Sequence, residues 1–241
     1  MKQFIFFYFL LLLSVSLNAQ EHQPSVTTTS LAQLAQKADA IVLAQVRDTD
    51  YFYRHEYPVG GSAFMKVLIS YKLDRPADLI EVYEKGLHQN ECYFPNRTVF
   101  EEGRRYLLFL KHDPEQADRY RGLSEGCALQ VLVDSNNRYV LRVPADGIRL
   151  SDPLMEAAVE LTFSDPYSIE NDENLASEER DRLLQSGSII PYEARSQEAD
   201  TLDMSAKPAE SPGRQWIYTR GIDLAVVRKL MELPAKPRDQ Q

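Results

Sequence analysis

Few residues of the 241-residue sequence have the type and spacing that a catalytic or metal site requires. None of the four histidines has an HExxH or other metal-ligand spacing: His22, His55, His88 and His112. Gly-x-Ser-x-Gly does not occur, and the 36 carboxylates give too many accidental pairs to single out an acid. We predict no catalytic, cofactor-binding or metal-ligating residue. The alternative is a hydrolase whose loop carboxylates and histidines converge at one end of the fold.

Aromatic side chains are concentrated in one stretch of the chain. Tyr51, Phe52, Tyr53 and Tyr57 fall within residues 48–61, whose proline and glycines predict a long loop or a hairpin tip. Aromatic rings gathered in a loop can stack on a glycan or fill a groove of a protein. These four residues are therefore a candidate partner-binding loop. The alternative is that alternate members are buried in the core.

A local group of arginines stands in an otherwise neutral part of the chain: Arg97, Arg104, Arg105, Arg119 and Arg121. Such a group can hold an oligonucleotide. The whole chain has 27 basic and 36 acidic residues, net charge −9, so it has no general attraction to nucleic acid. We expect these arginines to pair instead with residues 151–213, where most of the excess acid lies.

Residues 1–19 are typical of a secretory signal peptide. Lys2 gives a positive start, an apolar run begins at Phe4, and small residues lead to a cleavage position after Ala19. The run is shorter than the roughly 20 residues of a membrane span, which argues against an uncleaved anchor. We expect a bacterial protein secreted to the periplasm or the medium, with no membrane span in the mature chain.

Apolar periodicity predicts a mainly β fold. Ser30 and Gln33 form a capping box for a short helix over 31–38. Six strands of similar length follow: 41–46, 63–72, 79–83, 105–110, 129–133 and 139–143. Asn136-Asn137 suits a tight turn between the last two strands, because Asn tolerates positive φ. One helix before six strands predicts a closed or nearly closed antiparallel β-barrel.

The chain divides into a signal peptide, a polar leader, a barrel domain, an acidic segment and a C-terminal part: 1–19, 20–29, 30–150, 151–213 and 214–241. The acidic segment has little apolar periodicity beyond a short helix at 154–161, so we expect it to be partly disordered.

The C-terminal part combines an apolar patch with an amphipathic helix. Trp216, Ile217 and Tyr218 form the patch, and residues 222–231 form the helical face. This helix either binds a partner or packs back on the barrel, and we expect the second.

Four features occur in a fixed order. The first is a short helix running into the strand 41–46, and the second is an alternating strand from Phe64. The third is the strand 80–83, a loop with Cys92 and the block 100–109 with its Phe-x-x-Gly-x-x-Tyr-Leu spacing. The fourth is Cys127 at the start of the next apolar strand. Over residues 31–134 this order resembles the netrin-like module of the tissue inhibitors of metalloproteinases. The resemblance implies a five-stranded OB barrel.

The chain departs from these inhibitors at its expected mature N-terminus. In the family, a Cys-x-Cys pair there lets the terminal amine and the first carbonyl chelate the zinc of the target protease. Here the expected start is Gln20-Glu21, and no cysteine precedes Cys92. We therefore do not carry protease inhibition over to this chain.

The two cysteines, Cys92 and Cys127, are candidate disulfide partners because an exported protein meets oxidising conditions. Two buried thiols and an intermolecular bridge are the alternatives. In the resembled family the matching positions bridge to the N-terminal pair. The resemblance implies that, without that pair, these two cysteines sit near one another and can bond directly.

Taken together, these features predict an exported, non-catalytic binding protein that needs no cofactor and whose partner is a protein or an envelope component. The first alternative is a scaffold or assembly factor that acts through its acidic C-terminal extension. The second alternative is a secreted hydrolase.

If Cys92 and Cys127 form a bond, labelling of the unfolded, unreduced protein finds no free thiol. The bond is expected to contribute about 2–5 kcal/mol to the free energy of unfolding, as measured by denaturation with and without reductant. Two labelled thiols per chain would rule the bond out, and a dimer that reductant dissociates would show intermolecular pairing.

Overall fold

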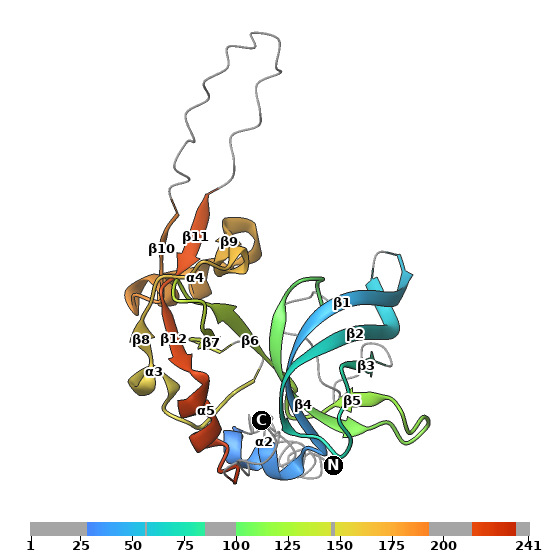
Figure 1. Ribbon diagram of the computed structural model, residues 1–241. Coiled ribbons are helices and arrows are strands. Elements are labelled where there is room, and N and C mark those ends of the chain that lie inside the picture. The colour runs from blue at the N-terminus through green and yellow to red at the C-terminus, as the bar shows by residue number, and fades with distance from the viewer. Residues whose placement is uncertain (1–27, 56, 85–99, 146–147, 193–213, 235–241) are drawn as a thin grey trace, which may run out of the picture.

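A long antiparallel hairpin is the central element of the fold (Figure 1). The computed structural model describes residues 28–55, 57–84, 100–145, 148–192 and 214–234. Strand β1 (Ala40–Arg54) pairs with β2 (Tyr57–Lys72) from Ile41 to Arg54. Both strands are longer than the sequence predicts, and the stretch 48–61 is the outer part of this hairpin rather than a long loop.

Five strands close into a barrel. Strands β3 (Leu79–Glu84), β4 (Arg105–His112) and β5 (Tyr120–Gly122) complete the order β1-β2-β3-β5-β4, and β4 pairs back onto β1. The predicted OB-fold-like barrel is confirmed. The prediction that it is wholly antiparallel is wrong, because β3 and β5 run parallel where Val82 faces Tyr120. The barrel is therefore mixed.

Helix α2 (Leu31–Lys37) begins at the predicted capping box. The Ser30 hydroxyl accepts a hydrogen bond from the Gln33 N–H (3.1 Å), and the Gln33 side-chain oxygen accepts one from the Ser30 N–H (2.9 Å). Leu31, Leu34 and Ala35 form its buried face. The helix is short, as predicted, because the chain enters β1 at Ala40.

The sheet continues from β4 away from the barrel. Strand β6 (Ala128–Val133) pairs with β4, and β7 (Tyr139–Arg142) pairs with β6. The turn between them has Asn137 at φ 60, as the sequence predicts. Strands β12 (Arg220–Asp223) and β8 (Val159–Glu160) complete the nine-stranded sheet of the described residues.

The short helix predicted at 154–161 is present as α3 (Leu154–Ala157), and β8 takes up part of the predicted range. From residue 164 to residue 192 the acidic segment has regular elements where the sequence predicts linker. These are η1 (Pro166–Ser168), β9 (Ile169–Asn171), η2 (Asp172–Asn174), α4 (Ser177–Gln185) and β10 (Ile189–Pro191). The sequence shows no detectable period there because these elements have only 3 to 9 residues. Residues 193–213 lie outside the described residues.

Strand β11 (Gln215–Tyr218) joins β9 and β10 in a three-stranded sheet. Its Trp216 and Tyr218 are buried in a cluster with Leu183 of α4 and Ile189 of β10. The predicted apolar patch therefore anchors the C-terminal part of the chain to the acidic segment.

Helix α5 (Leu224–Leu230) packs back on the barrel side of the fold, which confirms the expected one of the two alternatives. Leu224, Val227 and Met231 lie in one buried cluster with Leu34 of α2 and Leu43 of β1. No helix among the described residues combines the length and the hydrophobicity that crossing a membrane requires.

Met231→Ala is expected to lower the free energy of unfolding by about 2–5 kcal/mol, because it opens a cavity where the native side chain is 2% exposed. Urea denaturation measures the change. Lys229→Ala, at an exposed position of the same helix, is the matched control and is expected to stay within about 0.5 kcal/mol of the native value. Equal stabilities of the two variants would contradict the packing of α5.

Candidate functional site

The outer part of the β1–β2 hairpin extends beyond the barrel (Figure 1). Strand β4 pairs with β1 only as far as Gln45. The Val46 N–H then donates to the Arg104 carbonyl, and the Val46 carbonyl accepts from the Gly103 N–H. Past that point β1 has β2 as its strand partner among the described residues. We call residues 47–61 the hairpin arm.

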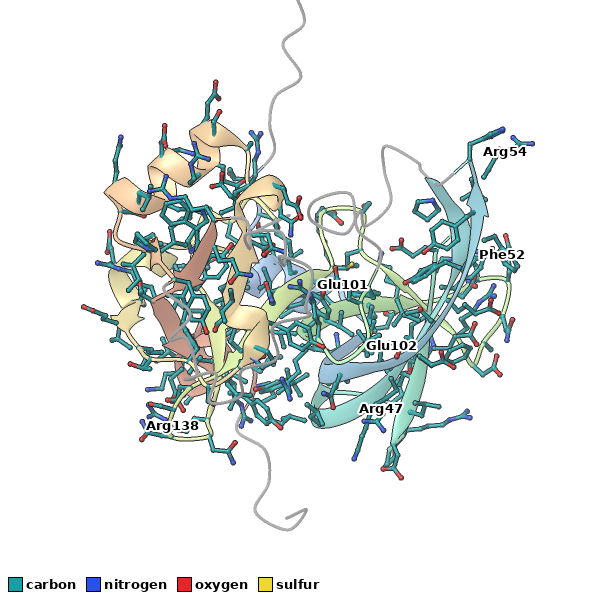
Figure 2. The ribbon with its side chains drawn as sticks, turned by 90° about the horizontal axis from the view of Figure 1, so that it is seen from above. Arg47, Phe52, Arg54, Glu101, Glu102 and Arg138 are labelled. Carbon is teal, nitrogen blue, oxygen red and sulfur yellow. The ribbon has the colours of Figure 1, made fainter. Side chains whose placement is uncertain are left out.

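The arm exposes aromatic side chains. Phe52 is 62% exposed and Tyr53 58% exposed, and Figure 2 shows Phe52 with Arg54 at the margin of the molecule. Val59, which sequence reasoning missed, is also exposed. Its residue type could have indicated it, because valine is β-branched and favours strands over the turn that this stretch otherwise predicts. The side chain of Tyr57 lies outside what the structure describes.

Tyr51 points into the fold and fixes the base of the arm. Its ring packs against the cluster that fills the barrel, and this burial, with the nearby charge of Glu84, raises the pKa of its hydroxyl. Opposite Tyr51, Gly61 has φ +138, and a Cβ there would lie 2.2 Å from the Asp50 carbonyl oxygen. Only glycine fits this close approach. The predicted group is thus divided, with one partly buried ring, Tyr51, and two exposed ones, Phe52 and Tyr53.

The predicted arginine group is divided among separate ion pairs. Arg104 pairs with Glu101 (2.5 Å), and Arg105 pairs with the buried Asp165 (2.9 Å). The second pair confirms, for Arg105, the expected pairing with the acidic segment. Arg97 lies outside the described residues.

Asp113 holds two more of these arginines, Arg119 (2.5 Å) and Arg121 (2.9 Å). Tyr83 lies 3.8 Å from the Arg119 guanidinium and stacks on it. Burial alone would raise the pKa of Asp113, but hydrogen bonds from the Glu115 N–H and from Arg119, with the charge of Arg121, lower it below its ordinary value. The arginines therefore stabilise the end of β5 and do not form an open cationic face.

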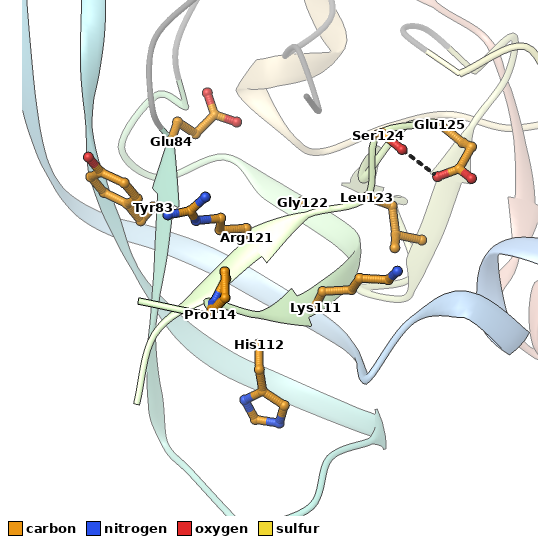
Figure 3. Close-up of a pocket in the computed structure, with 10 residues that line it drawn as sticks. All are labelled: Tyr83, Glu84, Lys111, His112, Pro114, Arg121, Gly122, Leu123, Ser124 and Glu125. Atoms are coloured by element: carbon orange, nitrogen blue, oxygen red, sulfur yellow. Dashed lines mark hydrogen bonds between the residues drawn. The ribbon is translucent and has the colours of Figure 1, made fainter. Parts of the chain in front are cut away.

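A pocket of about 280 Å³ lies beside this cluster (Figure 3). Its volume is at or below the roughly 300 Å³ at which ligand pockets usually begin. Of its charged groups, Arg121 is bound to Asp113, and Glu125 is bound to Lys37 at 2.6 Å. Figure 3 shows His112 pointing away from Arg121. Two of the charged groups that line the pocket are therefore held by ion pairs within the fold.

The two described histidines lie at opposite ends of β1. His55 follows its last residue at the tip of the hairpin, whereas the His112 N–H donates to the Asp39 carboxylate (3.1 Å), next to its first residue. His22 and His88 lie outside the described residues. Within the described ranges, no group of His, Cys, Asp or Glu side chains could hold a metal ion.

Cys127 is buried in the cluster that fills the barrel, near the start of β6. Cys92 lies outside the described residues. The Cys92–Cys127 bond therefore stays a prediction.

Asp113→Asn is expected to lower the free energy of unfolding by about 3 kcal/mol at neutral pH, because two partly buried guanidinium groups lose their carboxylate. The folded-state pKa of Asp113 is lowered, so its contribution is present above the unfolded-state pKa of about 3.9 and is lost as the pH falls through the folded-state value. The stability difference between wild type and variant should therefore shrink in acid.

Urea denaturation between neutral pH and pH 3 measures this difference. Asp118→Asn, at an exposed position of the same turn, is the matched control. A difference that is independent of pH, or an equal loss in both variants, would contradict the role of the Asp113 ion pairs.

Comparison of the chain with protein-family models, with curated proteins and with solved structures finds no match. The proposals that follow rest on the geometry of the described residues and on the sequence.

Proposed function

We propose that this is an exported, non-catalytic binding protein whose hairpin arm docks into a groove of a partner protein. The observation that carries the proposal is the exposure of Phe52 and Tyr53 on a hairpin that projects from the barrel. Large aromatic side chains supply much of the binding energy of protein interfaces when they enter a partner's pocket. Two of them on one projection are costly to leave in water, so a partner that covers them gains from their burial.

The arm is suited to binding because its shape is largely set before a partner arrives. Pairing with β2 continues from Asp48 to Arg54, and the partly buried Tyr51 ring packs against the cluster that fills the barrel. A preformed element loses less conformational entropy on binding than a flexible loop does. This favours docking of the arm over docking of a disordered segment.

We also propose that the barrel is a netrin-like domain without the protease-inhibiting function of its family. The strand order β1-β2-β3-β5-β4, with α2 ahead of β1, supports the first part. The lack of any cysteine before Cys92 supports the second. Export rests on residues 1–19, which lie outside the described residues.

A scaffold function through the acidic extension is the second candidate. Its support is the uneven charge of residues 151–192, which contain ten acidic and two basic residues, a net charge of −8. Part of that charge is used inside the fold, since Asp165 binds Arg105 and Asp172 accepts hydrogen bonds from Trp216 and Arg180. For this reason we favour the hairpin arm.

The test is capture from native envelope extract by the immobilised full chain, followed by titration of the purified partner. The double variant Phe52→Ser/Tyr53→Ser should bind that partner at least about thirtyfold more weakly, as expected when hot-spot residues are lost. Leu79→Ser/Val159→Ser, which changes two other exposed apolar residues, is the matched control and should bind like wild type.

Thermal unfolding of both double variants checks that each remains folded. Undiminished binding by the arm variant would contradict the proposal. Capture that instead disappears on neutralising Glu173, Glu178 and Asp181, all exposed, would favour the acidic extension.

A further inference from the structure

Among the described residues, the hairpin arm has a strand edge without a partner strand, in addition to its exposed aromatic rings. From Arg47 to Arg54, β1 pairs with β2 on one side, and no described strand pairs with the other side. We infer that this edge binds an extended segment of the partner protein by β-strand addition, with the segment lying beside β1 where β4 has turned away. The inference rests on the proposed function, because it specifies how the partner of the arm is held.

The backbone of the arm supplies the template. Within the described ranges, Val46 is the last residue of β1 whose backbone groups are bonded on the β4 side, to Gly103 and Arg104. Further out, the Thr49 N–H donates to the Asp48 carboxylate at 2.9 Å, and a carbonyl group of an added segment would replace this carboxylate as its acceptor. An edge strand with free N–H and C=O groups readily pairs with another extended chain. The edge is long enough for a segment of about five or six residues.

The side chains next to this edge indicate what the segment carries. Phe52 and Tyr53 are exposed beside it, and aromatic residues pair well across strands with β-branched or aromatic neighbours. Such residues also have the highest preference for extended structure. A segment that alternates β-branched or aromatic residues with polar ones therefore fits the arm.

Charge selects between possible occupants. The edge has two cations, Arg47 and Arg54, and two anions, Asp48 and Asp50, so it repels neither sign strongly. The whole chain has a net charge of −9, which favours a neutral or basic segment and disfavours pairing with a second copy. Charged residues and the Asp48 cap also limit indiscriminate edge pairing. The occupant is therefore a neutral or basic extended segment of a different protein.

The experiment uses a phage-displayed library of random linear decapeptides, selected on the full-length protein. The selected peptides are synthesised, and each is then N-methylated at one backbone amide at a time. In an added strand only alternate amides point toward β1. Methylation at alternate positions should weaken binding by about tenfold or more, and methylation between them should have little effect. Hydrogen exchange should slow at amides within 49–54 when the peptide binds.

Two protein variants separate this inference from the proposed function. Thr49→Pro removes the N–H that donates to the Asp48 carboxylate and should weaken peptide binding, while Phe52→Ser/Tyr53→Ser tests the aromatic side chains. If the aromatic variant loses the peptide but methylation has no alternating effect, docking by the arm stands and strand addition is overturned. If peptide binding is unchanged by both protein variants and by every methylation, both docking by the arm and strand addition are overturned. Because the methylation series uses wild-type protein, it tests strand addition even if Thr49→Pro does not fold.

Two further outcomes would overturn the inference. The first is a library that yields no peptide with a dissociation constant below about 100 μM, which is weak even for a short segment. The second is a dimer in sedimentation equilibrium that Thr49→Pro dissociates, since the edge would then pair with a second copy of this chain.

Discussion

The double pairing of strand β1 is the constraint on which the rest of the structure depends. Over Ile41 to Gln45 it pairs with β2 on one side and β4 on the other, and this closes the barrel. Both of its faces are then buried, with Val42 among the residues that fill the barrel and Leu43 in the cluster shared by α2 and α5. Where β4 leaves at Val46, the same two strands continue as the hairpin arm. The position of the exposed aromatic rings is therefore a consequence of how the barrel closes.

Ion pairs with buried carboxylates hold several parts of the fold together. Asp113 binds Arg119 and Arg121 beside β5, and Asp165 binds Arg105 between the barrel and the acidic segment. Each of these pairs fixes the position of an arginine beside a buried carboxylate. The arm, in contrast, exposes Phe52 and Tyr53 beside a strand edge that no described strand pairs with.

The sequence predicted those parts of the fold that local physics decides. A strand buried on both faces has a continuous apolar run, which is what residues 40–44 show, and Asn137 takes the positive φ that its turn needs. Strand β5 was missed because Tyr120, Arg121 and Gly122 have no strand period and become a strand only by pairing with β3 and β4. The elements of residues 164–192 were missed because they are stabilised by burial against Trp216, more than 20 positions away in sequence. Of the candidate site, the aromatic residues could be named from the sequence, but their division into one partly buried ring and two exposed ones depends on the barrel.

The account depends most on the hairpin arm being formed in the free protein. Residue-resolved amide hydrogen exchange of the full chain, without any partner, tests this directly. We expect the slowest exchange at residues 41–45, which are paired on both sides. Along residues 48–54 we expect slow and fast amides to alternate, since only one side of the strand is paired. Uniformly fast exchange from residue 47 to residue 61 would show that the arm is not preformed and would contradict the account.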